Sequence, residues 1–216
     1  MAIEKIRRVA WYLYDFGNSS YSATIASTLF PVYYTNEIAG NENRLGDALW
    51  GEAISISMAL SALLGPYIGG IADHLRIRKR MLILFTFLCI LSVASFSFLE
   101  KGMAKEGVLL IVLANFGMES AFIFYNSFLP QLKRGSGIGK MSALGFGTGY
   151  LGSIVSLFSF PSSRSEKADK VGLAFLLPFF SRILFAFILC RPPLRTLLSR
   201  VYSFLQKKVS PRPFDL

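Results

Sequence analysis

Residues 69–80 read GGIADHLRIRKR, a polar turn with one acid and four cations between two long apolar runs. The runs at 49–72 and 81–99 are each close to the length of about 20 residues that a helix needs to cross the bilayer hydrocarbon. Basic residues at the ends of apolar segments are typical of the cytoplasmic side of membrane proteins. The stretch therefore predicts a membrane-spanning helical hairpin whose turn faces the cytoplasm.

The composition also indicates an integral membrane protein. Of the 216 residues, 53% are hydrophobic and 17% are charged, and the mean hydropathy is +0.48. Soluble domains have about 45–50% apolar and about 25% charged residues. The net charge of +10 is carried at the ends of apolar segments and not along one aromatic-studded face. This favours the lipid bilayer, with its anionic headgroups, over nucleic acid as a partner.

The predicted fold class is all-α, with six transmembrane helices. The candidate spans lie at residues 9–34, 49–72, 81–99, 107–130, 139–160 and 171–190. Strands of a membrane barrel would alternate in hydropathy, which these continuous runs do not. The sixth span is the weakest, because Pro178 and Arg182 fall near its centre and an arginine there costs about 2.5–3.5 kcal/mol.

The distribution of basic residues predicts the orientation. Most of the 23 Lys and Arg residues lie at the N-terminus, in the 69–80 turn, after the fourth span and beyond residue 190, so both termini are predicted to be cytoplasmic. Residues 1–190 would form the six-span unit. Residues 191–216 have apolar side chains at helical spacing and would form a basic amphipathic cytoplasmic tail. An unstructured basic tail is the alternative.

Polar side chains gather on one face of the first predicted span. They are Asp15, Asn18, Ser19 and Ser22, at positions i, i+3, i+4 and i+7. This spacing places all four on one side of a helix. Because ionisable groups in hydrocarbon are costly, we expect this face to line a wet cavity. Tyr14, Asp15 and Asn18 are therefore candidates for a substrate or coupling-ion path.

The fourth predicted span repeats the arrangement with Asn115, Glu119 and Asn126, at i, i+4 and i+11. By residue count, Asp15 and Glu119 lie at comparable depth in different helices. One interpretation is that one of these acids binds a substrate amine or carries a coupling proton. An ion pair with Arg182 is the first alternative. Placement at the membrane interface is the second, and it applies more to Asp15.

Small residues recur at every fourth position in two spans, which predicts helices that approach closely. The first series is Gly65 and Gly69, and the second is Gly145, Gly149 and Ser153.

The sequence lacks the histidine and glycine patterns of common enzyme active sites. The single histidine, His74, lies in the charged turn, which excludes histidine-based triads and histidine-rich metal sites. The glycines near residue 149 lie in an apolar span and lack the strand-to-helix setting of a phosphate-binding loop. We therefore predict no enzymatic activity, no cofactor and no metal.

The charged turn resembles the signature loop of the major facilitator superfamily. That loop reads Gly, three residues, an acid, a base, one residue, Gly, one residue and two bases. The matching residues are Gly69, Asp73, Arg78 and Lys79. His74 stands where a base is usual, and Arg76 stands where glycine is usual.

Three further segments narrow the resemblance. They are WYLYDFGNSSY at residues 11–21, FYNSFLP at 124–130 and GYLGS at 149–153. Together they resemble the vacuolar-effluxer branch of that superfamily, which includes the autophagy-associated vacuolar amino-acid exporter. The likeness covers about residues 10–157.

The resemblance implies the N-terminal half of a twelve-helix transporter that moves small, amino-acid-like solutes by alternating access. It assigns Asp73 as the acid of a cytoplasmic gate, with Gly69 in the same motif and with Arg78 and Lys79 as supports. The membrane would be an inner membrane in a bacterium and a vacuole-type membrane in a eukaryote.

With only one half present, three interpretations stay open. The chain is a truncated or frameshifted product, or one half that assembles with a separately encoded second half, or a half that pairs with itself. A different functional class is a non-transporting membrane remnant or scaffold that binds partners through its basic cytoplasmic face.

Overall fold

The computed structural model describes residues 2–132 and 137–158, and every regular element in these ranges is a helix. The all-α prediction is therefore confirmed for this part of the chain. The predicted sixth span at 171–190, Arg182 within it, and the tail at 191–216 lie outside the described residues.

Four helical segments in the described ranges are long and apolar enough to cross a membrane. They are Glu42–His74, Arg78–Phe98, Ala104–Leu132 and Gly137–Phe158. These segments coincide with the second to fifth predicted spans, so these four predictions are confirmed. Their main helices are α3 (Leu45–His74), α4 (Arg78–Ser95), α5 (Ala104–Ser127) and α7 (Gly137–Phe158), with the short α6 (Leu129–Leu132) after α5.

The first predicted span, 9–34, is helical but is not among these four segments. It consists of α1 (Ala2–Tyr21), the π-helix η1 (Ser22–Thr28), α2 (Leu29–Tyr33) and a second π-helix, η2 (Tyr34–Ile38). Its polar face, which includes Asp15 and Asn18, lowers its hydropathy. Its crossing of the bilayer therefore stays a prediction.

Hydroxyl groups and a proline explain why this helix is irregular. Thr24 donates its hydroxyl hydrogen to the Ser20 carbonyl at 2.7 Å, and Thr28 donates to the Ala23 carbonyl five residues earlier. Such bonds compete with the regular backbone ladder and bend helices. Pro31 also lacks the N–H that an α-helix needs at that position. The regular α-helical hydrogen-bond pattern is therefore interrupted inside the predicted membrane segment.

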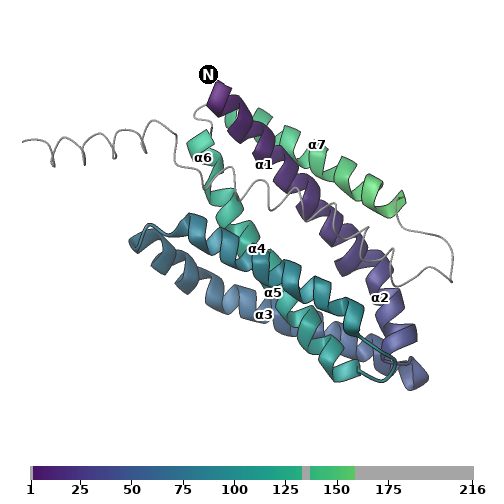
Figure 1. The fold of residues 1–216 in the computed structure, drawn as a ribbon. Coiled ribbons are helices and arrows are strands. Elements are labelled where there is room, and N and C mark those ends of the chain that lie inside the picture. Colours follow the sequence, from purple (N-terminus) through teal and green to yellow (C-terminus); the bar gives the residue numbers. More distant parts are fainter. Residues whose placement is uncertain (1, 133–136, 159–216) are drawn as a thin grey trace, which may run out of the picture.

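The described helices pack as two groups that are joined by side-chain contacts between α1 and α5. Figure 1 shows α7 beside α1, while α5 packs against both α3 and α4. Helix α3 contributes little to the interior. Its buried residues form one stripe, namely Gly46, Ala53, Ser57, Gly65 and Ala72. Most of the remaining α3 surface is exposed within the described part of the chain.

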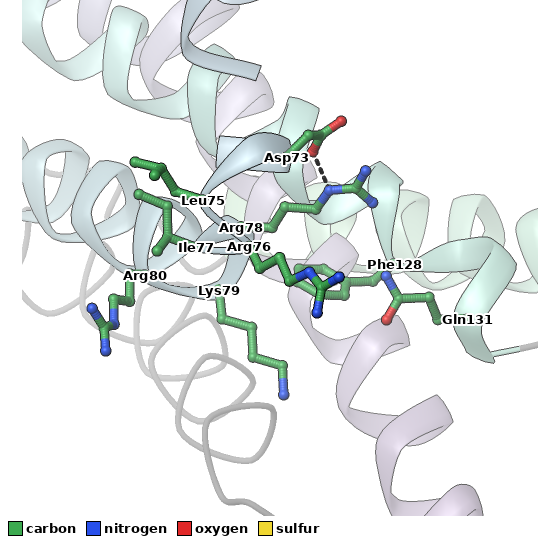
Figure 2. A pocket seen from close by; sticks show the side chains of 9 residues that line it. All are labelled: Asp73, Leu75, Arg76, Ile77, Arg78, Lys79, Arg80, Phe128 and Gln131. Carbon is green, nitrogen blue, oxygen red and sulfur yellow. Dashed lines mark hydrogen bonds and ion pairs between the residues drawn. The ribbon is translucent and has the colours of Figure 1, made fainter. Parts of the chain in front are cut away.

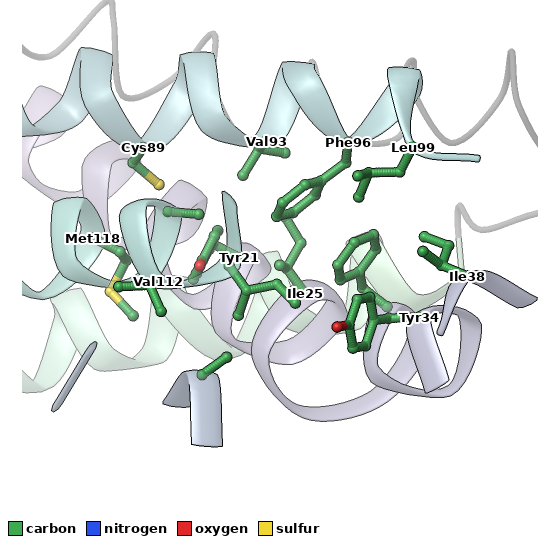
Figure 3. Packing of buried hydrophobic residues seen from close by; sticks show 14 residues of the cluster. Tyr21, Ile25, Tyr34, Ile38, Cys89, Val93, Phe96, Leu99, Val112 and Met118 are labelled. Atoms are coloured by element: carbon green, nitrogen blue, oxygen red, sulfur yellow. The ribbon is translucent and has the colours of Figure 1, made fainter. Parts of the chain in front are cut away.

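An aromatic cluster anchors the end of the bundle opposite the 69–80 turn (Figure 3). The rings of Phe30 and Phe96 stack with centroids 4.2 Å apart. The hydroxyl of Tyr34 donates to the Ala104 carbonyl at 2.8 Å. These contacts tie α2 and η2 to the short 3-10 helix η4 (Phe96–Phe98) that follows α4 and to α5, so the irregular first helix is held at this end by packing.

Glycines allow α1 and α7 to approach closely, as their spacing predicts. A Cβ on Gly145 would collide with the ring of Trp11. The hydroxyl of Ser153 donates to the Ser19 carbonyl at 3.0 Å across the interface. The role predicted for the 145–153 series is therefore confirmed.

Candidate functional site

A polar contact joins α3 and α5 inside the apolar bundle. The Nδ2 of Asn115 donates to the Ser57 Oγ at 2.8 Å, and Ser57 donates to the Ile54 carbonyl at 2.8 Å. Asn115 is 2% exposed and Ser57 is fully buried. Sequence reasoning identified Asn115 but missed Ser57, because a serine in an apolar run gives no signal of its own.

The register of this interface places Glu119 at the level of Ser61. Asn115 meets Ser57, and a Cβ on Gly65 would lie 3.1 Å from the Cδ1 of Ile123 two helical turns further along. In both contacts the α5 residue comes 58 positions after its α3 neighbour in the sequence. Glu119 and Ser61 have the same offset, one turn beyond the first contact.

Ser61 has a buried hydroxyl without a hydrogen-bond partner among the described residues, and Glu119 is half-buried. Burying a polar group without a partner is costly, so such a group often marks a site for water or a ligand. We call Ser57, Ser61, Asn115 and Glu119 the α3–α5 polar seam. Asn126 lies on the same side of α5 but is exposed in the described part of the chain.

The acid of the first helix lies in a different interface. Asp15 is 5% exposed and Asn18 is 7% exposed. A Cβ on Gly149 would lie 3.2 Å from a carboxylate oxygen of Asp15, so this side chain faces α7. The structure thus brings Asn115 and Glu119 together and places Asp15 and Asn18 along α1. Neither acid forms an ion pair with a cation of the described ranges.

Aromatic contacts connect the two groups of helices beside Asp15. The ring of Tyr125 stacks on Trp11 and on Tyr14, with centroid separations of 4.7 and 4.6 Å. Tyr125 also donates its hydroxyl hydrogen to the Trp11 carbonyl at 3.1 Å. The hydroxyl of Tyr14 lies 3.3 Å from the Oγ1 of Thr86 on α4. Tyr14 therefore links three helices. Sequence reasoning missed the role of Tyr125, because an aromatic side chain in an apolar segment usually belongs to the hydrophobic core.

The 69–80 turn closes α3 with a Schellman motif. The N–H of Ile77 donates to the Ala72 carbonyl at 2.9 Å, and the N–H of Arg76 donates to the Asp73 carbonyl at 3.2 Å. This motif places its C′ residue in the left-handed region, where glycine is usual. Arg76 takes this conformation with φ of 54°. The turn keeps the geometry that glycine would favour, although a non-glycine residue there costs about 1–2 kcal/mol.

Within this turn, Asp73 is paired with Arg78. Asp73 lies near the C-terminal end of α3 and accepts this hydrogen bond from the side chain of Arg78. A cavity of about 600 Å³ opens beside the pair, between the turn and the end of α5 (Figure 2). The gate residues of the resemblance thus lie at one surface of the described bundle.

The sequence profile of a family described as "Vacuole effluxer Atg22 like" matches residues 52–160, which is about half of the chain. The chain belongs to this family. The match includes the charged turn, all four residues of the polar seam and Gly149. It begins after Tyr14, Asp15 and Asn18.

Individual relatives of this Atg22-like chain come from bacteria and fungi. An "Uncharacterized MFS-type transporter YxiO" of Bacillus subtilis is 32% identical over 148 residues, which are 68% of this chain and 35% of the relative. An Aquifex aeolicus protein is 30% identical over 81% of this chain and 44% of its own length. "Autophagy-related protein 22" of Pyricularia oryzae is 36% identical over 80 residues, 37% of this chain and 12% of that protein. No solved structure matches.

The apolar helices and the family together identify a multi-pass integral membrane protein. The chain also spans less than half the length of each of these relatives.

Removing the Ser57 hydroxyl is expected to destabilise this Atg22-like bundle. In Ser57→Ala the buried Asn115 amide loses its acceptor, which should lower the free energy of unfolding by about 1–2 kcal/mol. The measurement is unfolding in mixed micelles by titration with sodium dodecyl sulfate, followed by circular dichroism. The matched control is Ser55→Ala, because the exposed Ser55 only donates to the Gly51 carbonyl of its own helix, at 2.7 Å. Equal losses in the two variants would contradict a structural role for the seam.

Proposed function

We propose that the chain forms the N-terminal, six-helix half of a secondary transporter. This half would move small, amino-acid-like solutes by alternating access. Glu119 carries the proposal, because a half-buried carboxyl group in an apolar helix is costly and usually functional. Membership of the vacuole-effluxer family supports a transport role.

The proposal includes a path for the solute or a coupling proton. Its residues are Tyr14, Asp15, Asn18, Asn115, Glu119 and Asn126. Within this path, Glu119 is the residue that binds the substrate amine or carries the proton. Asn115 holds α5 against α3, and the exposed Asn126 extends the path toward the end of α5. The burial of Asp15 against Gly149 suits a group that becomes accessible when α1 and α7 move apart.

The proposal also includes a second six-helix half. Helix α3 leaves most of its surface uncovered by the described helices, and the bacterial relatives are more than twice as long as the matched regions. Residues 1–190 would form the first half with both termini cytoplasmic, and residues 191–216 would lie along the membrane surface. Asp73, Arg78 and Lys79, with Gly69, would form the gate between the halves.

The test is solute flux in proteoliposomes. One set holds this chain alone, and a second holds the chain co-expressed and co-purified with the C-terminal half of the Bacillus subtilis relative. Uptake of labelled amino acids under a proton gradient is expected only in the second set. If a co-purifying pair gives no flux with any amino acid, the transport proposal is wrong and a scaffold that binds partners through its basic face takes its place.

A further inference from the structure

The cavity beside the charged turn has walls of two kinds. Arg76 and Lys79 are cationic, Gln131 is polar, and Leu75, Ile77 and Phe128 are apolar. Its volume of about 600 Å³ is in the range of small-molecule sites, which are about 300–1,000 Å³. A ligand that fills it would need both an anionic and an apolar part.

The cations of this cavity are not neutralised by the acid of the turn. Asp73 is paired with Arg78. Figure 2 shows Arg76 extending toward Gln131, while Lys79 extends downward in this view and Arg80 points to the other side. Two positive charges and an amide donor therefore line one volume. Arg and Lys side chains with an amide group form a favourable set of donors for a phosphate.

The position of the cavity favours a lipid as the source of that phosphate. It lies where the membrane-spanning segments Glu42–His74 and Arg78–Phe98 end, which is the depth of lipid headgroups. Leu75 is 57% exposed at its rim, whereas Phe128 is buried at its wall. An apolar rim next to two cations suits the junction between a headgroup and its acyl chains. Each basic residue near an anionic membrane surface contributes about 1 kcal/mol to lipid binding.

We propose that this cavity binds the phosphate of an anionic phospholipid, with Arg76 and Lys79 as the charged contacts and Gln131 as a neutral donor. The apolar side chains contact the upper part of the acyl chains. The site is separate from the α3–α5 polar seam. It shares Lys79 with the proposed gate, but lipid binding is measured without transport.

The test is a lipid titration of the purified chain in a maltoside detergent, read by native mass spectrometry. Phosphatidylglycerol is expected to bind at least tenfold more tightly than phosphatidylcholine. The variant Arg76→Asn with Lys79→Gln should lose this tenfold preference. Asparagine is chosen because it tolerates a positive φ. The control Lys101→Gln with Lys105→Gln removes the same charge from exposed positions at the other end of the bundle and should change the affinity less than twofold.

Two further variants and a competition experiment test the same proposal. Arg76→Lys keeps the charge and should retain the preference, whereas Gln131→Glu places an acid in the cavity and should reduce phosphatidylglycerol binding at least threefold. Inorganic phosphate at 100-fold excess over the lipid should not displace it. Displacement would identify a free phosphate site and overturn the lipid proposal. An unchanged affinity in Gln131→Glu, or equal losses in the cavity and control variants, would overturn it as well.

Discussion

Replacing Glu119 with glutamine is expected to reduce solute uptake driven by a proton gradient to the level of protein-free vesicles. Glutamine has nearly the same shape as glutamate, but it cannot carry a proton or pair with a substrate amine. The helix should tolerate the change, because a neutral amide costs less in hydrocarbon than a carboxylate. The variant should therefore insert and purify like the parent chain. The assay uses the chain co-purified with a second half.

A second measurement separates the two roles proposed for Glu119. In counterflow, labelled solute enters vesicles preloaded with unlabelled solute, and no net proton movement is required. If Glu119 carries the coupling proton, Glu119→Gln should lose uphill uptake and keep counterflow. If it binds the substrate amine, both activities should be lost.

The matched control is Glu52→Gln. Glu52 lies near the start of α3, is exposed, and is predicted to lie at headgroup depth. It should keep both activities within about twofold, since an exposed carboxyl is not part of a buried site. Full uphill uptake in Glu119→Gln would contradict a coupling or substrate role for this residue and would favour a structural role in the polar seam.

Hydropathy predicts the second to fifth spans well because each is a long apolar run with polar ends. Hydropathy is a weaker predictor for the first helix. Asp15 and Asn18 give it a polar face, and that face is buried by α7 within the described fold. A hydropathy average counts these residues against a membrane span, although their neighbours shield them. The π-helical segments could not be predicted either, since they depend on hydroxyl bonds such as that of Thr24.

The candidate site was only partly predictable for a similar reason. Helical spacing predicts that Asn115 and Glu119 lie on one side of α5, but spacing within one helix does not say which neighbour covers that side. The structure supplies α3 as the neighbour, and with it Ser57 and Ser61. Two serines without a charged residue nearby carry no signal until the register between the helices is known.

The interface between α1 and α7 gives the largest expected effect on stability, from the substitution Gly152→Ala. A methyl group on Gly152 would collide with the carbonyl oxygen of Phe16 and would lie 2.9 Å from its carbonyl carbon. These are backbone atoms of α1, so they cannot rotate away as a side chain would. Overpacking of this kind costs about 1–3 kcal/mol.

Separating the helices would also lengthen two hydrogen bonds across the interface. Ser153 donates to the Ser19 carbonyl at 3.0 Å. Thr148 shares its hydroxyl hydrogen between the Gly145 carbonyl of its own helix at 2.7 Å and the Tyr12 carbonyl at 3.2 Å. Interhelical bonds in membranes are worth about 0.6 kcal/mol on average. We therefore expect Gly152→Ala to lower the free energy of unfolding by about 2–4 kcal/mol, measured by the same detergent titration.

Gly147→Ala is the control that makes this prediction specific. Gly147 lies on the same helix, five residues away, but no described atom lies within 4 Å of a Cβ placed there. Alanine also has a higher helix propensity than glycine by about 1 kcal/mol, so this variant should be as stable as the parent or slightly more stable. Equal destabilisation by both substitutions would mean that α7 does not pack on α1 through its glycines. A loss confined to Gly152→Ala would show that the close approach beside Asp15 depends on the absence of one methyl group.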